Sequence, residues 1–352
     1  MEDIKAISVN FQVEGELLNH NMLKNGLIND TYVLEYSTEQ SYILQKINKN
    51  IFREPEKIMH NIQLVSSHLA RKRQQSLEIV PTRNNELLYI DDAYYWRMYK
   101  CIIEGKVLDK VSTAKQCYSL GIAIGSFHNN LVDFPVEELK ITLLDFHNTN
   151  KIYSNFLKAI EQSTEKRTIA AKDEISFLKA RKDKYAKIQY LIEGGQIPMR
   201  VCHNDTKFSN VLLQQNTEQP LALIDLDTLM PHTILFDFAD AIRTLAAGND
   251  ENETDLTTVN FNLQFFESFT NGFLEKCRNI LTPLEQKHLA FSCSLITLEQ
   301  AMRFLTDFLE GDTYYKTIYA SQNLDRAKNQ IHLSKQIEEN IKQMEEIICR
   351  FS

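Results

Sequence analysis

The chain has 352 residues, of which 43% are hydrophobic and 24% charged, an ordinary globular composition that allows a substantial core. Its net charge of −8 argues against a nucleic-acid partner, because nucleic-acid binding requires a basic face. The charged start Met1-Glu-Asp-Ile-Lys5 and the lack of a long apolar run argue against a signal peptide and a membrane partner, so a cytoplasmic protein is expected.

The first hundred residues predict a small antiparallel sheet. Residues 31–36 and 41–47 alternate between apolar and polar, and the turn at 37–40 joins them into a hairpin. Residues 9–15 fit either a short helix or a strand. Further short strands are expected at 77–80, 87–90 and 93–99, with asparagine and aspartate pairs as turns.

One amphipathic helix interrupts these strands. Pro55 suits the first turn of a helix, and the apolar side chains that follow at helical spacing form one stripe. They are Ile58, Ile62, Val65 and Leu69. Residues 100–105 then connect this part to the rest of the chain.

From residue 112 the hydrophobic pattern becomes helical. A helix is predicted over 113–131, and residues 151–191 predict two long charged helices at the surface. A helix beginning at 236, a long apolar helix over 289–309 and a terminal amphipathic helix over 322–352 complete the expected elements. Helices gathered after a sheet indicate the α+β class.

Between these helices lies the stretch His203-x-Asp205-x-Lys207-x-x-Asn210, followed by a short apolar strand that ends at Asp225. Kinase catalytic loops carry an Asp and, five residues on, an Asn, and a strand then delivers a second Asp to the metal. Asp205 could position or deprotonate the attacking hydroxyl, and Lys207 could neutralise phosphate charge. Asn210 and Asp225 offer the oxygen ligands that Mg²⁺ prefers. The plainer alternative is a polar turn between two strands.

This loop and several other segments resemble the aminoglycoside phosphotransferase and choline kinase superfamily, and within it the N-acetylhexosamine 1-kinases most closely. The resemblance implies a protein-kinase-like two-lobed fold. It would have an N-terminal lobe over 1–100 that binds nucleotide and a mostly helical C-terminal lobe over 101–352 with the catalytic loop, metal and substrate. The segments are Gly26-Leu-Ile-Asn-Asp-Thr-Tyr32, Tyr42-Ile-Leu-Gln-Lys-Ile-Asn48, His203-Asn-Asp-Thr-Lys207, Ile224-Asp-Leu-Asp-Thr228, Phe236-Asp-Phe-Ala-Asp-Ala-Ile-Arg243, Arg303-Phe-Leu-Thr-Asp307 and Gly311-Asp312, with Ala239 where the family pattern has Gly.

The resemblance also implies where ATP would bind. The loop from Gly26 to Thr31, with Asn29 between them, would cover the phosphates or border the sugar. On the second strand either Gln45 or Lys46 would face the phosphates, because neighbouring side chains of a strand point to opposite faces; the family pattern favours Gln45 and charge favours Lys46. The adenine would bind the connector backbone, at Tyr99, Cys101 and Ile102.

The substrate residues are expected on the late helix. Glu299, Arg303 and Asp307 share one face, which alone fits a surface ion-pair ladder, but apolar neighbours indicate that part of this face is buried. A buried arginine requires polar partners. The resemblance implies sugar contacts from this helix. The expected set is Asp205, Asp227, Thr228, Glu299, Arg303 and Tyr314, while Asp237 or Asp240 is expected to cap the catalytic loop.

The sequence therefore predicts a kinase that uses ATP with Mg²⁺ to phosphorylate the anomeric hydroxyl of N-acetylhexosamine, giving the sugar 1-phosphate. The alternative is a kinase of another small alcohol, such as an aminoglycoside, choline or a homoserine-like substrate. A non-catalytic nucleotide-binding protein is disfavoured because Asp205, Asn210 and Asp225 are all present. Monomer and homodimer both stay open.

Overall fold

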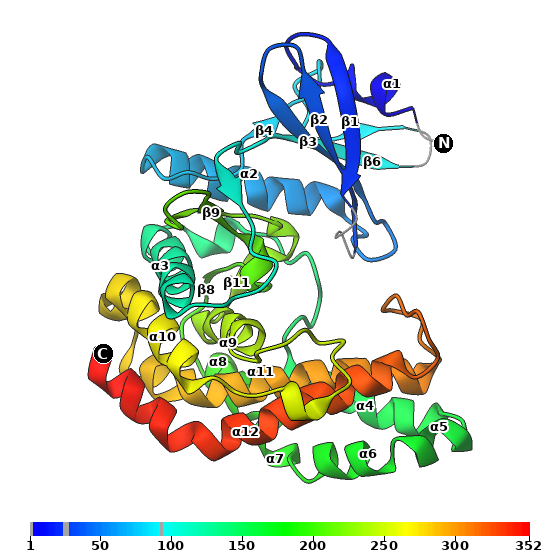
Figure 1. Cartoon of the computed structure of the whole chain (residues 1–352), viewed down its shortest axis with the longest axis vertical. Coiled ribbons are helices and arrows are strands. Elements are labelled where there is room, and N and C mark those ends of the chain that lie inside the picture. The colour runs from blue at the N-terminus through cyan, green and yellow to red at the C-terminus, as the bar shows by residue number, and fades with distance from the viewer. Residues whose placement is uncertain (1–2, 24–27, 92–93) are drawn as a thin grey trace.

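The structure is a computed structural model that describes residues 3–23, 28–91 and 94–352, and Figure 1 shows a sheet with one helix beneath it at one end and a larger helical part at the other. In the described residues the sheet has six antiparallel strands in the order β1-β2-β3-β6-β4, and β5 also pairs with β6. Its elements are α1 (Ile4–Ser8), β1 (Leu17–Leu23), β2 (Asp30–Tyr36), β3 (Ser41–Ile47), α2 (Pro55–Arg71), β4 (Ile79–Val80), β5 (Tyr89–Ile90) and β6 (Tyr95–Lys100).

The predicted hairpin β2–β3 and the helix α2 are confirmed, with every apolar stripe residue of α2 buried. The sequence did not predict β1 or α1. Six of the seven β1 residues are exposed, so this strand has no apolar alternation that a pattern could reveal. The predicted strands at 77–80 and 87–90 are shorter than expected, at two residues each.

The two faces of this sheet have different neighbours. One face packs with α1 in a small core of its own, which contains Leu34, Leu44, Trp96 and Met98. The opposite face carries Thr31, Gln45 and Arg97 side by side in register and looks toward α2 and the helical lobe. Side chains on this second face can therefore reach the space between the lobes.

The helix α2 ties the sheet to the lower lobe. Asn61 is fully buried on α2, and its Nδ2 donates to the carbonyl oxygens of Leu229 and Lys140, each at 2.8 Å. Its Oδ1 accepts from the backbone N–H of Lys140, also at 2.8 Å. Every polar group of this amide is thus used to join the lobes.

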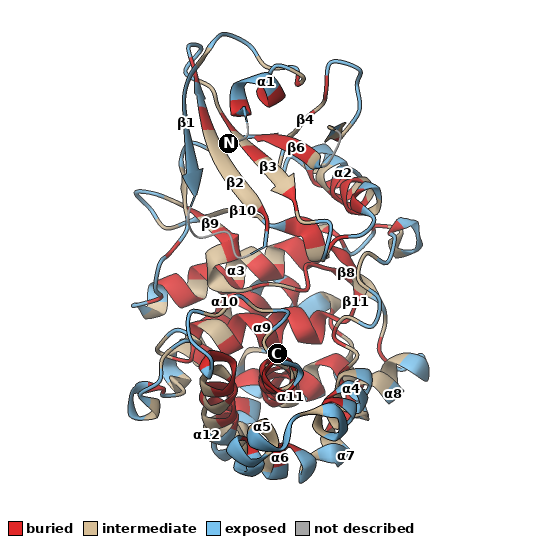
Figure 2. Cartoon of the chain, turned by 90° about the vertical axis from the view of Figure 1, so that its right-hand side faces the viewer, coloured by how far each residue is buried: buried red, intermediate tan, exposed pale blue. Residues whose placement is uncertain are grey.

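The lower lobe is built around α9 (Ile234–Leu245) and α11 (Pro283–Glu310), which Figure 2 shows as largely buried. Two glycines of α3 (Ala114–Asn130) and one of α10 (Leu263–Cys277) let these two helices pack closely. A Cβ at Gly121 would lie 2.2 Å from the Phe269 carbonyl oxygen, and one at Gly272 would lie 2.3 Å from that of Tyr118. The main helices are α3 (Ala114–Asn130), α9 (Ile234–Leu245), α10 (Leu263–Cys277), α11 (Pro283–Glu310) and α12 (Gln322–Phe351). Of these, α3, α9, α11 and α12 confirm predicted helices, whereas α10 was not predicted.

The prediction of two long helices over 151–191 is wrong. The structure has five shorter ones, because turns at Ala171, Arg181 and Ala186 redirect the chain so that apolar side chains such as Leu178 and Tyr185 reach the core. They are α4 (Thr149–Gln162), α5 (Glu165–Ala170), α6 (Lys172–Lys179), α7 (Lys182–Tyr185) and α8 (Lys187–Glu193). Among the described residues, no helix combines the length and the apolar character needed to cross a membrane.

Short strands frame the stretch between the lobes. They are β7 (Gly105–Lys106), β8 (Arg200–Cys202), β9 (Val211–Gln214), β10 (Pro220–Leu223) and β11 (Met230–His232). Strands β7, β9 and β10 form one small sheet, and β8 pairs with β11. The loop between β8 and β9 and the turn after β10 hold the predicted catalytic and metal residues. The division at residue 100 into two functional lobes remains a prediction.

Candidate active site

The loop between β8 and β9 brings three predicted residues into direct contact. The Asp205 carboxylate accepts from Lys207 Nζ at 2.9 Å and from Asn210 Nδ2 at 2.9 Å. The side chains of Asp205 and Lys207 are about one third exposed, at 30% and 31%. Burial opposes ionisation of Asp205, but Lys207 and His203 outweigh it and lower the pKa of the carboxyl. The site therefore presents an ionised carboxylate that a ligand can reach.

Asp225 lies next to this group. The backbone N–H of Ile224 donates to the Asn210 carbonyl oxygen at 2.9 Å, and His203 Nε2 donates to the Ile224 carbonyl oxygen at 2.8 Å. Asp225 itself is exposed and adopts a left-handed backbone with φ of +60°. Partial loss of water around the Asp225 carboxyl, together with the neighbouring carboxylate of Asp227, raises the pKa of Asp225 to about 6.

The side-chain oxygens of Asn210 and Asp225 are suited to bind a divalent cation. Asn210 uses its Nδ2 on Asp205, which leaves Oδ1 as the atom that could bind an ion. Asp225 offers a carboxylate whose negative charge is unfavourable beside Asp205 and Asp227, and a cation would relieve this repulsion. The donor set consists of hard oxygens, as Mg²⁺ prefers.

A buried aspartate of α9 holds the catalytic loop from below. Asp237 accepts from the backbone N–H groups of His203 at 2.8 Å and Asn204 at 2.7 Å, and its Oδ2 pairs with His128 Nε2 at 3.0 Å. These contacts confirm that Asp237 caps the loop. Asp240 instead pairs with Arg243, whose Nη2 lies 2.8 Å from its Oδ1.

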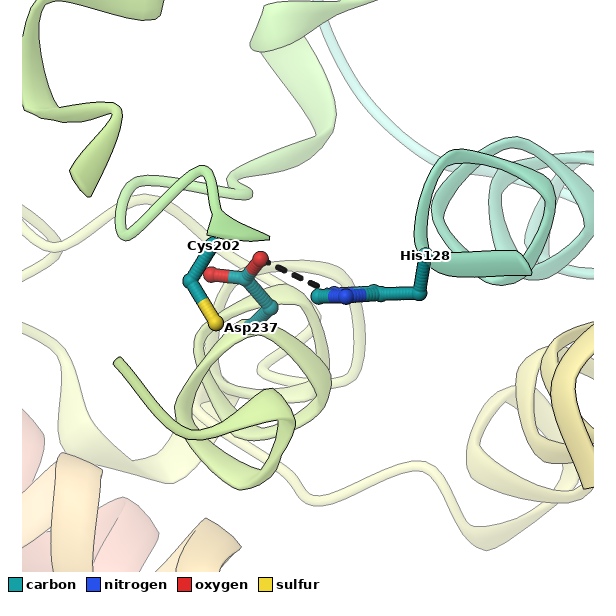
Figure 3. A group of neighbouring side chains, drawn as sticks. All are labelled: His128, Cys202 and Asp237. Atoms are coloured by element: carbon teal, nitrogen blue, oxygen red, sulfur yellow. Dashed lines mark ion pairs between the residues drawn. The ribbon is translucent and has the colours of Figure 1, made fainter. Parts of the chain in front are cut away.

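Figure 3 shows that Cys202 joins this cluster, so that possible ligand atoms of His128, Cys202 and Asp237 lie within 4.8 Å of one another. We interpret the cluster as an anchor and not as a metal site. Both oxygens of Asp237 already have hydrogen-bond donors. Burial raises the pKa of the Cys202 thiol well above its usual value, so the thiolate that a metal requires is disfavoured.

In the upper wall of the cleft, Gln45 and Lys46 point to opposite faces of the sheet. Gln45 Nε2 donates to Thr31 Oγ1 at 3.0 Å, and Gln45 Oε1 accepts from Arg97 Nε at 3.0 Å. Lys46 lies on the other face, with Nζ 3.2 Å from the centre of the Tyr94 ring. The expectation from charge, that Lys46 faces the phosphates, is therefore wrong in this register. Phosphate binding by Gln45 and Thr31 stays a prediction.

Arg97 was not predicted as a site residue, and it reaches from β6 to the turn after β10, where Asp227 lies. Its Nη1 lies 2.5 Å from Asp227 Oδ1, and the two side chains are only 1% and 2% exposed. Burial opposes the charge of Arg97, but Asp227 raises the pKa of the guanidinium overall. Asn29 Nδ2 donates to the second Asp227 oxygen at 2.7 Å.

This network gives two of the predicted site residues partners within the protein. Asp227 has a partner at each carboxylate oxygen, Arg97 at one and Asn29 at the other. Asn29 also accepts from the Asn48 backbone N–H at 2.9 Å. A substrate contact of Asp227 and a phosphate contact of Asn29 stay predictions. Thr228 likewise donates its hydroxyl to the His203 carbonyl oxygen at 2.7 Å and steadies the loop. Gly26 lies outside the described residues.

Part of the connector backbone is already used. The Cys101 N–H donates to the Ser41 carbonyl oxygen at 2.9 Å, and the Ile102 carbonyl oxygen accepts from Gly105 at 3.0 Å. The Tyr99 side chain points toward α2, where its hydroxyl lies 3.9 Å from Met59 Sδ. Adenine binding at this connector stays a prediction that must use other backbone groups.

A cavity of about 340 Å³ lies in the lower lobe and contains three of the predicted substrate residues. Glu299, Arg303 and Tyr314 line it, and Arg303 sits over the rings of Phe146 and Tyr315, at 5.5 and 5.8 Å from their centres. Glu299 Oε2 and Thr306 Oγ1 are buried in the cavity wall without a hydrogen-bond partner in the described structure. Both oxygens can accept a hydrogen bond from water or from a ligand in the cavity.

Asp307, by contrast, serves the fold. Its carboxylate accepts from the backbone N–H groups of Thr313, Tyr314 and Tyr315 at 2.8 to 2.9 Å and so shapes the loop after α11. The cavity also contains His147, which no sequence pattern had indicated. His147 Nε2 lies 2.9 Å from the carbonyl oxygen of Asn204. A residue that lines the cavity is therefore hydrogen-bonded to the residue before Asp205.

Comparisons with known proteins agree with this geometry. The sequence profile of the Phosphotransferase enzyme family (APH) matches residues 22–261, more than half of the chain. Solved structures with the same fold include an amicoumacin kinase in complex with AMP-PNP, Ca²⁺ and Ami, at 14% identity over 96% of this chain and 94% of that chain, with a TM-score of 0.64. A microcompartment-associated aminopropanol kinase has 16% identity over 97% of both chains and a TM-score of 0.64.

A Plasmodium vivax ethanolamine kinase has 15% identity over 90% of this chain and 82% of that chain, with a TM-score of 0.58. Identities this low carry information about the fold alone. Together with the antiparallel sheet and the helical lobe, they confirm the predicted α+β, two-lobed, protein-kinase-like fold.

Proposed function

The chain belongs to the phosphotransferase enzyme family, and from this premise we propose that it transfers the γ-phosphoryl group of ATP to a hydroxyl of a small molecule bound in the cavity beside the catalytic loop. The observation that carries the proposal is the contact of Asp205 with both Lys207 and Asn210 at 2.9 Å. Phosphoryl transfer requires three groups close together: a carboxylate near the attacking hydroxyl, a cation and a metal ligand.

In the proposed reaction Asp205 accepts the proton of the substrate hydroxyl while the new oxygen–phosphorus bond forms and the bond from the γ-phosphorus to the bridging oxygen breaks, which releases ADP. The lowered pKa of Asp205 keeps the carboxyl ionised, which is the form that a proton acceptor must have. Lys207 offsets negative charge on the transferring group. Mg²⁺, held by Asn210 and Asp225 when bound, would neutralise phosphate charge.

For the acceptor we propose the anomeric hydroxyl of N-acetylhexosamine, with the sugar 1-phosphate as product. The resemblance of the motifs to the N-acetylhexosamine 1-kinases supports this choice. The cavity supplies matching chemistry: Glu299 Oε2 can accept from a sugar hydroxyl, and Arg303 can donate to hydroxyl or carbonyl oxygen. The rings of Phe146 and Tyr315 offer apolar surface for the C–H face of a sugar ring.

A second candidate acceptor is an amine-bearing alcohol, such as an amino alcohol or an aminoglycoside. The cavity wall supports it, because four carboxylates line the cavity against two groups that can carry positive charge, Arg303 and His147; the carboxylates are those of Asp145, Glu299, Asp307 and Glu310. This excess of carboxylates would favour an ammonium group. The titles of the similar structures name such acceptors for those proteins, aminopropanol and ethanolamine.

A coupled ADP-release assay distinguishes the two candidates. We would measure turnover with MgATP and N-acetylglucosamine, N-acetylgalactosamine, ethanolamine, choline, homoserine or an aminoglycoside. Turnover of a sugar to its 1-phosphate would support the first proposal, and turnover of amine-bearing acceptors alone would reject it in favour of the second. A thermal shift with MgATP but no turnover of any acceptor would reject both.

A further inference from the structure

A buried histidine joins the cavity to the catalytic loop. His147 Nδ1 lies 2.8 Å from Glu299 Oε1 on α11, and its Nε2 lies 2.9 Å from the carbonyl oxygen of Asn204. The two side chains of this pair are 6% and 2% exposed. His147 therefore touches both the residue before Asp205 and a residue that lines the cavity.

The chemistry of these two neighbours fixes the protonation of the ring. A carboxylate oxygen and a backbone carbonyl oxygen are both hydrogen-bond acceptors, whereas a neutral imidazole has only one N–H to donate. Either neutral tautomer would turn a lone pair toward an acceptor and leave one buried group unsatisfied, which costs about 1–3 kcal/mol. With Glu299 as a carboxylate, only the imidazolium, which has an N–H on each nitrogen, satisfies both contacts.

We propose that His147 is held as an imidazolium and acts as a positioning residue, which keeps the Asn204–Asp205 peptide in its reactive orientation and links that orientation to Glu299 in the substrate cavity. The kinetic part of this inference rests on the proposed phosphotransferase reaction, but the charge state of His147 does not. Asp205 is thereby expected to be correctly placed only while His147 carries its proton.

The groups around His147 favour its charged form. Glu299 faces it from α11 and Asp240 from α9, while His232 of β11 lies with its ring centre 5.8 Å away. Burial lowers the pKa of His232 to about 3, so that ring stays neutral and adds no competing charge. Arg303, one turn along α11 from Glu299, is the opposing cation on the cavity side. For His147 itself burial opposes the charge, but Glu299 raises the pKa above its usual value.

Asn204 explains why this contact matters for Asp205. Its backbone is left-handed, with φ of +64°, which an asparagine tolerates but does not prefer. Its N–H is fixed by Asp237 and its side chain by the Thr228 carbonyl oxygen, at 2.7 and 2.9 Å. The carbonyl oxygen is held by His147. Without that donor the Asn204–Asp205 peptide could rotate, and a shift of about 1 Å at a reacting group can cost about a hundredfold in rate.

The first test reads the charge of His147 in the free protein. Histidine ring nitrogens labelled with ¹⁵N report by NMR whether each nitrogen carries a proton, and the signal that is missing in His147→Gln identifies His147. We expect both nitrogens of His147 to stay protonated at pH values above the ordinary histidine pKa of about 6.5. A His147 signal that shows one bare nitrogen at that pH, or titrates at or below about 6.5, would overturn the proposal.

The second test reads the link to the cavity. In Glu299→Gln the carboxylate that favours the charge is gone, so the NMR titration of His147 should move to lower pH. The alkaline limb of the kcat profile should move with it, and in His147→Gln this limb should disappear while kcat falls about tenfold to a hundredfold. A loss of activity with an unchanged pH profile would indicate a merely structural role and reject the inference.

A matched control is His68→Gln, because His68 also pairs with a carboxylate, Asp133, at 3.1 Å, but lies on α2 outside the cavity. It should leave the kcat profile unchanged. If no acceptor is phosphorylated by the wild-type protein, the proposed function fails, while the NMR titration still decides the charge of His147. The two failures are therefore distinguishable.

Discussion

Two buried ion pairs hold the catalytic region from opposite sides, and they differ in kind. Arg97 and Asp227 join the sheet to the turn after β10, with side chains 1% and 2% exposed. His147 and Glu299 join the cavity of the lower lobe to the loop between β8 and β9, with side chains 6% and 2% exposed. A guanidinium remains charged at every physiological pH, whereas an imidazole changes its charge near neutrality. The upper pair is thus a permanent link, and the lower pair is a conditional one.

Each pair acts one or two residues away from a group of the proposed chemistry. Asp227 follows Asp225 by two residues, and Asn204, which His147 contacts, precedes Asp205 by one. The proposed metal ligand Asp225 and the proposed proton acceptor Asp205 are therefore held from different lobes. We therefore expect a mutation in the upper pair to lower stability at any pH. The stability change caused by a mutation in the lower pair should depend on pH.

The largest effect is expected from Asp205→Asn, which removes the group that both sides position. Loss of a general base typically costs about 10² to 10⁴ in rate, so kcat in the ADP-release assay should fall by that amount. The amide oxygen can still accept from Lys207 and Asn210, so thermal unfolding should change little. The exposed Asp255→Asn is the matched control. If Asp205→Asn kept more than a tenth of wild-type turnover, Asp205 would not be the base.

The next effect is on the upper pair. Arg97→Met leaves Asp227 buried without its cation, and breaking a buried pair in this way costs about 3–5 kcal/mol in the free energy of unfolding. Urea denaturation would measure it. The control Arg350→Met removes one side of an ion pair with Glu267 in which the partners are 60% and 38% exposed, and it should cost at most about 1 kcal/mol. Equal losses in the two variants would show that Arg97 does not link the lobes.

The charges of the lower pair lead to the third prediction, on stability against pH. The pKa of His147 is raised on folding, so its contribution is fully present below the unfolded value of about 6.5 and is lost as the pH rises through the folded pKa. The stability difference between wild type and His147→Gln should therefore shrink at alkaline pH, by about 1.4 kcal/mol for each unit of pKa shift. The difference caused by Arg97→Met should stay constant over the same range. A His147→Gln difference that grows with pH would contradict the imidazolium.

The sequence was informative where the chemistry is local. The spacing from His203 to Asn210 brings these residues into contact because a single loop holds them, and the hairpin and α2 follow from short-range periodicity. The sequence also indicates a role for Arg97, because it is the single charged residue in the segment Tyr-Trp-Arg-Met-Tyr, and a buried charge requires a partner. No pattern in the sequence indicates a role for His147. Its partner Glu299 is 152 positions away, and only the folded chain brings them together.

The smallest effect on catalysis is expected from the exposed Tyr314, in contrast to the buried residues discussed above. Tyr314 lines the cavity but is 51% exposed, so its hydroxyl loses little when water replaces a ligand contact. A neutral hydrogen bond contributes about 1 kcal/mol, so Tyr314→Phe should raise the KM for the acceptor about fivefold and leave kcat unchanged, because the contact does not change along the reaction. Tyr319→Phe, with a residue 40% exposed outside the cavity lining, is the control. If Tyr314→Phe instead lowered kcat and left KM unaltered, Tyr314 would help to place the reacting hydroxyl. The distinction between buried residues that position the reacting groups and an exposed residue that only binds the acceptor would then be wrong.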